Sequence, residues 1–342
     1  MDMKTVTFVI PCYNSQDYME KCIDSLLPGG DDIEILIVND GSKDRTAEIA
    51  DRYAAKYPNI VRAVHKENGG HGSGLNVGIE QAQGRYLKIV DSDDWAGEEA
   101  LQEVMRTLRS FISKGDEVDM MIANYVYEYV EENKQNRICY KNVFPQNKVF
   151  GWKEVKKVDH LKYILMHSVF YSTALLRKSG LKLPEHTYYV DNLFVYVPLP
   201  LVKNMYYLNV DFYHYYIGRI DQSVNEKVMV KRLDQQLRVN DLLMDAHDPM
   251  AYRQKEKMLG KYLIFYLSIM FTVSSTFASI DGSREAAEKC NALWQKLKKK
   301  DKKLYRKIRY GSKAFFMWLP GKLGKKLSVA FYRLARKVYK FN

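Results

Sequence analysis

Three aspartates stand together where a hydrophobic segment of the chain ends. Asp91, Asp93 and Asp94 follow the apolar run Tyr86 to Val90, with Ser92 between the first two. Hard divalent cations prefer carboxylate oxygens, and Mg²⁺ in particular binds one or two carboxylates together with substrate phosphates. The spacing therefore predicts a Mn²⁺ or Mg²⁺ site beside a phosphorylated substrate. The alternative is a solvated turn before a helix, because acidic clusters at loop ends are common.

Two further segments follow the same plan of an apolar run that ends in polar residues. Val6 to Ile10 leads into Pro11-Cys12-Tyr13-Asn14, and Ile33 to Val38 leads into Asn39-Asp40-Gly41-Ser42. Short, nearly continuous apolar runs are typical of strands buried on both faces of a parallel sheet, and helical stretches separate these runs. The pattern predicts an α/β fold with a Rossmann-like, mostly parallel sheet and flanking helices. Ligands of such sheets bind outside the carboxyl ends of the strands, so the three polar clusters should meet at one site.

The polar residues suit recognition of a nucleotide. Tyr13 offers a ring face on which a base can stack, and Asp40 offers an acceptor for the imide N–H of uracil. Each also has an ordinary explanation, because a tyrosine after a strand often packs at the rim and Asn-Asp-Gly-Ser forms a tight turn in any protein. Their joint position at the ends of neighbouring strands favours the nucleotide.

A glycine-rich stretch, residues 68–78, leads into a predicted helix. Its glycines allow backbone N–H groups to approach a phosphate, and a helix that begins there favours an anion at its N-terminus. The stretch is not a Walker loop, because no Gly-Lys-Ser/Thr follows. It also lacks the glycine spacing and the ribose-binding acid of a dinucleotide-binding fold. The sequence therefore predicts a phosphate contact of a different kind here.

Taken in order, these motifs resemble those of the family 2 glycosyltransferases, inverting enzymes with the GT-A fold that use nucleotide sugars. The resemblance covers about the first 110 residues and continues more weakly to about residue 225. Beyond that the chain is similar only in general terms to long bacterial members, here with a basic C-terminal extension. The matching segments are Val9-Ile10-Pro11-Cys12-Tyr13-Asn14, Ile37-Val38-Asn39-Asp40-Gly41-Ser42-Lys43-Asp44, Asn68-Gly69-Gly70, Asn76-Val77-Gly78-Ile79, Ala82-Gln83-Gly84, Asp91-Ser92-Asp93-Asp94 and, more weakly, Tyr188-Tyr189-Val190-Asp191-Asn192.

The resemblance implies which residues bind the donor. Pro11, Tyr13 and Asp40 are expected to contact its uracil and ribose. Leu75 stands where relatives often carry Arg, so His71 is a candidate for meeting the charge of the diphosphate. The other residues expected to contact the nucleotide sugar are Asn14, Gly70, Asn76, Asp91 and Ser92.

The resemblance also implies the metal ligands and the general base. Asp93 is expected to bind Mn²⁺ or Mg²⁺ directly, and Asp91 and Asp94 to share the metal, with ribose as an alternative contact for Asp94. Asp191 is expected to take the proton from the acceptor hydroxyl. Val190 stands where many relatives carry Glu, so the neighbouring acid is missing in this chain.

The sequence therefore predicts a metal-dependent, inverting glycosyltransferase. Its donor would be a nucleotide sugar, in particular a UDP-sugar, and its acceptor a hydroxyl of a bacterial cell-surface glycan or of a lipid-linked acceptor. Two alternatives stay open. A nucleotidyltransferase also joins such a sheet to metal-binding aspartates but releases pyrophosphate, and a catalytically inactive protein could retain the fold to bind a membrane surface.

The net charge of +12 comes from the C-terminal segment. Residues 284–342 contain 19 Lys and Arg against 3 Asp and Glu, whereas residues 1–283 contain 34 against 38. Apolar residues recur at helical spacing from Leu323 to Phe341 between basic ones, which is typical of a helix in a membrane interface. This predicts attachment to the anionic inner face of the plasma membrane. The alternatives are packing on the protein's own body and nucleic-acid binding, and the latter is disfavoured because no base-reading module accompanies the lysines.

The expected organisation has four parts. These are a nucleotide-sugar-binding half at 1–110, an acceptor-binding half at 111–225, a helical region at 226–283 and the basic amphipathic tail at 284–342. Within the acceptor half, His167 to Tyr171 is interpreted as core packing rather than as a lining of the acceptor cleft. The oligomeric state, the sugar and the acceptor are not specified by these patterns.

Two further features concern the compartment. Tyr262 to Ile280 carries no charge over 19 residues, yet its serines and threonines favour a buried or partly membrane-apposed helix over a span. Cys12, Cys22, Cys139 and Cys290 lack paired spacing, which predicts free thiols in a reducing cytoplasm. The first apolar run enters a strand directly, so no leader segment is expected.

Overall fold

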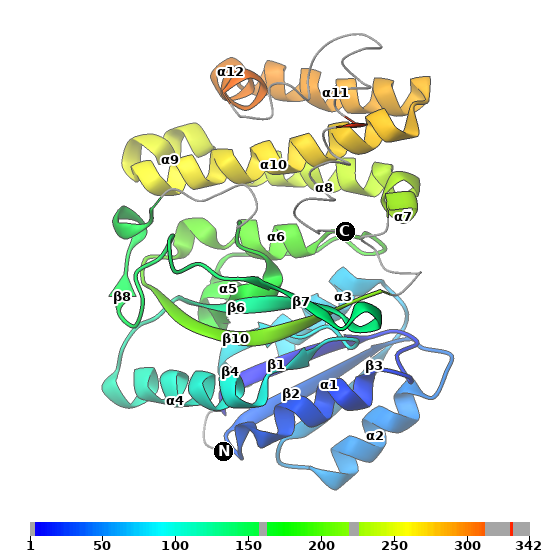
Figure 1. Ribbon diagram of the computed structural model, residues 1–342, viewed down its shortest axis with the longest axis vertical. Helices are drawn as coiled ribbons and strands as arrows, with labels where there is room; N and C mark the ends of the chain where they lie inside the picture. The colour runs from blue at the N-terminus through cyan, green and yellow to red at the C-terminus, as the bar shows by residue number, and fades with distance from the viewer. Residues whose placement is uncertain (1–3, 157–162, 219–225, 312–328, 331–342) are drawn as a thin grey trace. The chain divides into compact units, whose positions relative to one another are not determined.

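The structure, a computed structural model, divides into two compact units, residues 1–218 and 219–342 (Figure 1). The residues that it describes are 4–156, 163–218, 226–311 and 329–330. The first unit carries the sheet and every predicted site residue, and the second consists of helices. The boundary lies seven residues before the predicted end of the acceptor half at residue 225.

The N-terminal part of the first unit is a parallel sheet built from the predicted apolar runs. β1 (Lys4–Cys12), β2 (Ile33–Asp40) and β4 (Gly84–Ile89) confirm the three predicted strands, and nearly all of their side chains are buried. A fourth strand, β3 (Val61–Lys66), pairs with β2 at the edge of the sheet, and the sequence pattern does not predict it. Only Val61 is buried in it, because an edge strand needs no continuous apolar run.

Helices α1 (Met19–Leu26), α2 (Thr46–Lys56) and α3 (His71–Gln81) connect these strands, and α1 and α2 flank the blue N-terminal strands in Figure 1. A turn at Ser15 precedes α1. The Ser15 carbonyl accepts hydrogen bonds from the backbone N–H groups of Tyr18 and Met19 in this turn, so the helix begins at Met19.

The remaining elements of the first unit extend the sheet and mix its strand directions. The strand order is β3-β2-β1-β4-β9-β6-β10-β5, with β9 antiparallel to β4 and β6, and β10 parallel to β6. The predicted α/β fold with a mostly parallel sheet is confirmed. The elements are β5 (Trp95–Ala96), α4 (Glu98–Lys114), β6 (Met120–Tyr129), β7 (Lys134–Ile138), β8 (Val149–Phe150), β9 (Val169–Ser172), α5 (Thr173–Lys178), α6 (Asp191–Tyr196) and β10 (Met205–Ile217).

The long strand β10 has an irregular register that matters for the site. Its pairing with β6 shifts around Asp211, and Asn124 of β6 donates a hydrogen bond to that carboxylate at 3.0 Å. Such irregularities bend a strand and re-aim its side chains. Beyond the shift, Tyr213 and Tyr216 of β10 reach the acidic turn that follows β4.

The second unit is built around one long helix. The helices are α7 (Glu226–Lys231), α8 (Leu233–Ala246), α9 (Pro249–Lys255), α10 (Lys257–Asp281), α11 (Arg284–Lys300) and α12 (Lys302–Tyr310). By length and composition α10 could cross a membrane, but 61% of its most apolar window is buried inside the structure. It packs against α8, α9, α11 and α12, as expected for a core helix.

The first part of the basic segment folds onto this unit. Lys289 pairs with Asp234 of α8 at 2.8 Å, and Lys296 pairs with Asp245 at 3.1 Å. The apolar face of α11, which includes Trp294, is buried. The described part of the predicted tail is therefore packed on its own body. The amphipathic pattern from residue 323 to 341 lies outside the described residues except for 329 and 330, so membrane attachment stays a prediction.

The predicted free thiols are confirmed, since Cys12, Cys22, Cys139 and Cys290 are all unpaired.

Candidate active site

The acidic cluster forms a tight turn at the carboxyl end of β4. The backbone N–H of Asp94 donates to the carbonyl of Asp91 at 3.0 Å, which brings these two residues next to each other. Asp94 is buried, and its carboxylate accepts hydrogen bonds from the Tyr213 hydroxyl at 2.5 Å and from the Tyr216 backbone N–H at 2.9 Å. Burial, together with the charges of Asp93 and Asp91, raises the pKa of Asp94 well above its ordinary value. The ionised form of Asp94 is therefore disfavoured, and a nearby cation would stabilise it.

Asp91 lies between two imidazole rings. Nε2 of His71 is 3.8 Å from its Oδ1, and Nε2 of His167 is 3.9 Å from its Oδ2. Burial raises the pKa of Asp91 to about 6, against the opposing charge of Lys88. His71 and His167 are far apart in the sequence, so the cluster forms only when the chain folds.

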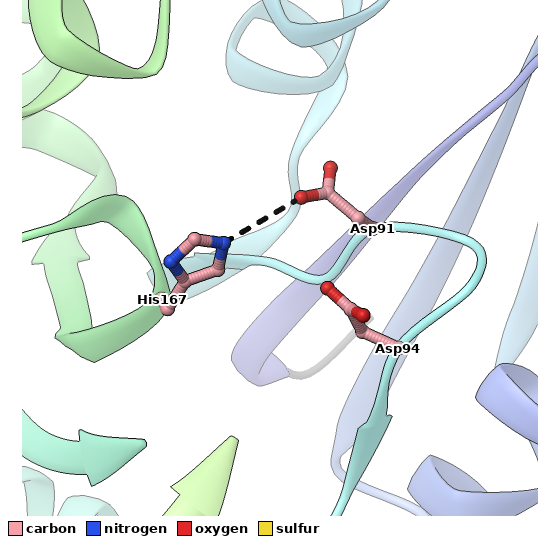
Figure 2. Close-up of side chains that lie close together, drawn as sticks. All are labelled: Asp91, Asp94 and His167. Carbon is pink, nitrogen blue, oxygen red and sulfur yellow. Dashed lines mark ion pairs between the residues drawn. The ribbon is translucent and has the colours of Figure 1, made fainter. Parts of the chain in front are cut away.

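Figure 2 shows Asp91 and Asp94 on the acidic turn, with the His167 ring facing them from another segment. One ligand atom from each of the three side chains lies within 4.8 Å of the others. Two carboxylates and a neutral imidazole fit a divalent cation. Asp93, the predicted direct ligand, is not one of these three, and its coordination of a metal stays a prediction. Asp91 and Asp94 are both in the cluster.

The interpretation of this segment as core packing is confirmed for Ser168 to Tyr171, which are fully buried, and His167 makes a further contact. Its ring does pack against aromatic rings, with centroids 4.7 Å from Tyr213 and 4.8 Å from Tyr215, but it also faces Asp91. Burial, with Lys88 and His71 nearby, lowers the pKa of His167 to about 3, so the ring is neutral at pH 7.

A buried lysine, Lys88, holds the backbone of the segment that carries His167. Lys88 is fully buried in β4 and donates hydrogen bonds to the carbonyl oxygens of Met166 at 2.8 Å and His167 at 2.6 Å. Burial lowers its pKa well below the ordinary value. The sequence did contain a signal for this residue, because a lysine inside the apolar run from Tyr86 to Val90 needs buried partners.

The predicted nucleotide residues lie at the ends of β1 and β2. Tyr13 is half exposed, at 50%, which leaves its ring available to a base. Asn14 adopts a left-handed conformation with φ 50°, and its side chain accepts a hydrogen bond from the Lys43 backbone N–H at 2.9 Å. Pro11 is buried in β1. Ser92 and Ser15 share a hydrogen bond of 2.8 Å, which ties the acidic turn to this loop.

Asp40 has an architectural role that the sequence does not reveal. One carboxylate oxygen accepts from Lys66 at 2.7 Å and from the Gly69 N–H at 2.9 Å, and the other from the Gly70 N–H at 2.7 Å and from Asn68 at 3.2 Å. A carboxylate has about four acceptor positions, so these donors fill them. The predicted contact with uracil stays a prediction, and it requires one of the four donors to move.

The glycine-rich stretch is joined to the loop that precedes the predicted base. The side chain of Asn76 donates to the Leu183 carbonyl at 2.9 Å and accepts from the Leu183 N–H at 3.0 Å. The His186 N–H donates to the Gly69 carbonyl at 2.7 Å. Asn76 is predicted to contact the nucleotide sugar, but both ends of its amide are committed to this loop. In the structure it ties the glycine-rich stretch to the loop that precedes Asp191.

Asp191 is the first residue of α6 and is partly buried. Burial raises its pKa to about 6, and His71 opposes this shift. Val190, at the place of the missing acid, is fully buried, which is consistent with an apolar residue there.

His71 is the first residue of α3 and lies among carboxylates. Burial lowers its pKa, while the charges of Asp191, Asp93 and Asp40 raise it. Asp91 of the acidic turn lies 3.8 Å from His71, and the charges of Asp191 and of Asp40 at the end of β2 also act on this histidine at a helix N-terminus.

Hydrogen bonds join the loop after β1 to the other two strand ends, from the Asn14 N–H to Ser42 at 2.9 Å and between Ser15 and Ser92 at 2.8 Å, so the three polar clusters meet as expected.

A mixed sheet with acidic residues at the carboxyl end of a central strand is the arrangement of the GT-A class. Residues 7–182 match the family model Glycosyl transferase family 2. The match covers half of the chain, and the chain belongs to this family of glycosyltransferases.

Individual relatives agree with this assignment. The chain is 27% identical over 282 residues to the putative glycosyltransferase EpsH of Bacillus subtilis, covering 79% of this chain and 77% of EpsH. It is 28% identical over 222 residues to the poly(ribitol-phosphate) beta-glucosyltransferase of Bacillus spizizenii, covering 63% of this chain but 32% of that protein. The crystal structure of S. aureus TarS 1–349 in complex with UDP-GlcNAc has a similar fold, with a TM-score of 0.67 and 19% identity, over 99% of this chain and 92% of that one.

Proposed function

We propose that this glycosyltransferase moves a sugar from a UDP-sugar to a hydroxyl of a cell-surface glycan or lipid-linked acceptor. The reaction would invert the anomeric centre and depend on Mn²⁺ or Mg²⁺. The observation that carries the proposal is the position of His71, which lies 3.8 Å from Asp91 and within the electrostatic influence of Asp191 and Asp93. The UDP-GlcNAc complex of TarS supports the choice of donor, and the name of the poly(ribitol-phosphate) beta-glucosyltransferase supports a polymer acceptor.

The chemistry of each residue follows from the charges that develop. The acceptor hydroxyl must lose a proton as it attacks the anomeric carbon, and Asp191 takes that proton in our proposal. A pKa of about 6 keeps Asp191 ionised at neutral pH while leaving it more basic than an ordinary aspartate. Because the oxygen attacks from the side opposite the departing diphosphate, an α-linked donor gives a β-linked product.

The departing nucleoside diphosphate gains negative charge, which must be met. The N-terminus of α3 offers backbone N–H groups, and His71 on its first turn offers a ring N–H. Burial lowers the pKa of His71, so this ring donates as a neutral imidazole. A divalent cation held by Asp91, Asp94 and His167 would supply Lewis-acid stabilisation of the same diphosphate.

Product analysis tests the reaction class. The full-length protein is incubated with a panel of UDP-sugars in Mn²⁺ or in EDTA, and the released nucleotide is identified. A glycosyltransferase releases UDP, by slow donor hydrolysis even without an acceptor. Pyrophosphate from a nucleoside triphosphate would instead establish the nucleotidyltransferase alternative. A protein that releases neither product, and whose unfolding temperature no nucleotide raises, would be the catalytically inactive protein that binds a membrane surface. A nucleotide present at 100 times its Kd should add about 2.7 kcal/mol to the free energy of unfolding, which raises the unfolding temperature by roughly 5–10 °C.

Peripheral attachment to the inner face of the plasma membrane is part of the same proposal. It is supported by exposed cations near the α11–α12 junction, each of which contributes about 1 kcal/mol near an anionic leaflet. Flotation with vesicles that contain anionic lipid tests it, and replacement of these cations by serine should reduce binding. Equal binding by the variant and the parent protein would refute a role for these cations in the attachment. The cations are Lys298, Lys299, Lys302, Lys303 and Arg306.

A further inference from the structure

Four tyrosines share one face of the paired strands β6 and β10. Side chains alternate between the two faces of a strand, so Tyr125 and Tyr127 of β6 lie on one face, as do Tyr213 and Tyr215 of β10. The register places Tyr213 beside Tyr125 and Tyr215 beside Tyr127. The rings of Tyr127 and Tyr215 meet edge to face, with their centroids 5.6 Å apart. The two strands therefore present a continuous aromatic surface.

The four rings differ in their exposure. Tyr125 and Tyr213 are buried, and the Tyr213 hydroxyl donates to Asp94 at 2.5 Å, so this inner pair supports the acidic turn. Tyr127 and Tyr215 are partly exposed, and we call them the outer pair. A partly exposed tyrosine offers an apolar ring together with a polar hydroxyl. Ligand sites are typically lined by such aromatic side chains with a few polar groups.

The outer pair adjoins the acidic turn. The His167 ring, whose Nε2 lies 3.9 Å from Asp91, has its centroid 4.8 Å from that of Tyr215. Burial raises the pKa of Tyr215 well above its ordinary value, and the charges of the three aspartates in the acidic turn add to this shift. Tyr215 is therefore close to the place where the proposed function puts the diphosphate of the donor.

The outer pair is also linked to the proposed base through Tyr163, which is partly exposed. Burial raises the pKa of Tyr163, and the charges of Tyr127 and Asp191 add to this shift. An acceptor hydroxyl must reach both Asp191 and the sugar of a donor whose diphosphate lies at the acidic turn. The rest of the acceptor molecule then lies within reach of the outer pair.

The outer pair is uncharged at neutral pH. Burial raises the pKa values of Tyr127 and Tyr215 and lowers that of His167 to about 3, so these three rings are neutral at pH 7. Lys88 is fully buried and donates to backbone carbonyl oxygens, so an acceptor cannot pair with it. Phosphates are bound best by charged donors such as Arg and Lys, whereas a neutral sugar needs a ring face for its C–H groups and polar groups for its hydroxyls.

We propose that Tyr127 and Tyr215 form the acceptor subsite, and that this subsite takes a neutral sugar ring rather than a polyol phosphate or a lipid phosphate. The C–H face of the sugar packs on an aromatic face, and the phenol hydroxyls bond to sugar hydroxyls. The sugar can end a free glycan or a lipid-linked one, because both present the same ring. The inference rests on the proposed function for the reaction, but sugar binding is measured without turnover.

The test measures sugar binding to the full-length protein by saturation-transfer NMR, with UDP and Mg²⁺ present. The probes are the methyl β-glycosides of glucose, galactose and N-acetylglucosamine, with ribitol phosphate as the anionic comparison. We expect transfer to the C–H protons of at least one glycoside and none to ribitol phosphate. Tyr127→Leu and Tyr215→Leu should each weaken glycoside binding roughly 2–10-fold, the range for one aromatic contact. Tyr215→Phe keeps the ring and should bind more tightly than Tyr215→Leu.

Turnover and a matched control complete the test. In the UDP-release assay the two leucine variants should raise the KM for the acceptor glycoside more than the Kd for UDP. Tyr57→Leu, which alters a partly exposed tyrosine stacked on Tyr53 at the end of α2, should change neither quantity. Circular dichroism establishes that each variant is folded.

Three results would overturn the proposal. These are the absence of saturation transfer to every glycoside, glycoside binding by the folded leucine variants that equals that of the parent protein, and binding of ribitol phosphate in preference to the glycosides. Failure of the proposed function has a different signature, which is the absence of UDP release from every UDP-sugar. Glycoside binding that depends on Tyr127 and Tyr215 can persist in that case.

Discussion

Replacement of Asp191 by Asn should make the enzyme more stable and far less active. The carboxyl group has an ordinary pKa of 3.8, and burial raises this pKa to about 6. At pH 8 its ionised form is therefore destabilised in the folded protein by about 3 kcal/mol relative to the unfolded chain. Asn keeps the shape and removes the charge. We expect a gain in the free energy of unfolding of about 1 to 3 kcal/mol, the lower values reflecting contact with solvent at this partly buried site.

The sign of the pH dependence provides the sharper test. A carboxyl group with a raised pKa stabilises the folded state below pH 4, where it is protonated in both states, and this contribution is lost as the pH rises through 6. The advantage of Asp191→Asn should therefore be full at pH 8 and absent near pH 4. Urea unfolding in EDTA, followed by fluorescence of the first unit's Trp95 and Trp152, measures it at both values.

The same variant should lose about 10²- to 10⁴-fold in turnover if Asp191 is the general base, with donor binding retained. Turnover of the parent enzyme should fall as the pH drops below about 6. Asp17→Asn, at an exposed position, is the matched control and should change stability by less than about 0.5 kcal/mol. A gain for Asp191→Asn that is equal at pH 4 and pH 8 would refute the ionisation argument, and wild-type turnover would refute the catalytic role.

Three other variants probe the supports of the site. Asn76→Ala removes both hydrogen bonds to Leu183 and should lower the free energy of unfolding by about 1–3 kcal/mol, measured by urea unfolding, and lower kcat more than donor affinity. Tyr13→Ala should weaken UDP binding by about 1–3 kcal/mol in calorimetry while Tyr13→Trp retains it, because stacking on a base needs an aromatic face; equal affinities would show that the ring does not stack. Lys88→Met leaves the His167 carbonyl without its donor and should both destabilise the protein and weaken Mn²⁺ binding, whereas unchanged Mn²⁺ affinity would separate the lysine from the metal site.

The sequence is sufficient for those parts of the fold that have a strong local signal. β1, β2 and β4 are predicted because a strand buried on both faces must be continuously apolar, and the acidic turn is predicted because three carboxylates follow one of them. β3 and β10 are not predicted. β3 is an edge strand, and β10 is long, irregular and rich in tyrosine, so neither has a clean apolar period.

The roles of individual site residues depend on contacts that no local pattern records. His167 gains its significance from Asp91, 76 positions earlier in the chain, and the pairing exists only after β4 and β9 come together. Asp40 illustrates the reverse case. Its position is predicted correctly, but its hydrogen bonds to Lys66 and to two glycine N–H groups show a structural task that the uracil hypothesis omits.

The contact between the glycine-rich stretch and the loop before Asp191 bears on how this enzyme can be engineered. A Cβ atom on Gly70 would lie 3.0 Å from the backbone of His186, and one on Gly72 would lie 2.8 Å from the carbonyl oxygen of Pro184. Neither backbone can yield as a flexible side chain would. A chimera that imports the loop before Asp191 from a relative must therefore import the matching glycine-rich stretch with it. The two segments form one exchangeable module, although more than a hundred residues of chain separate them.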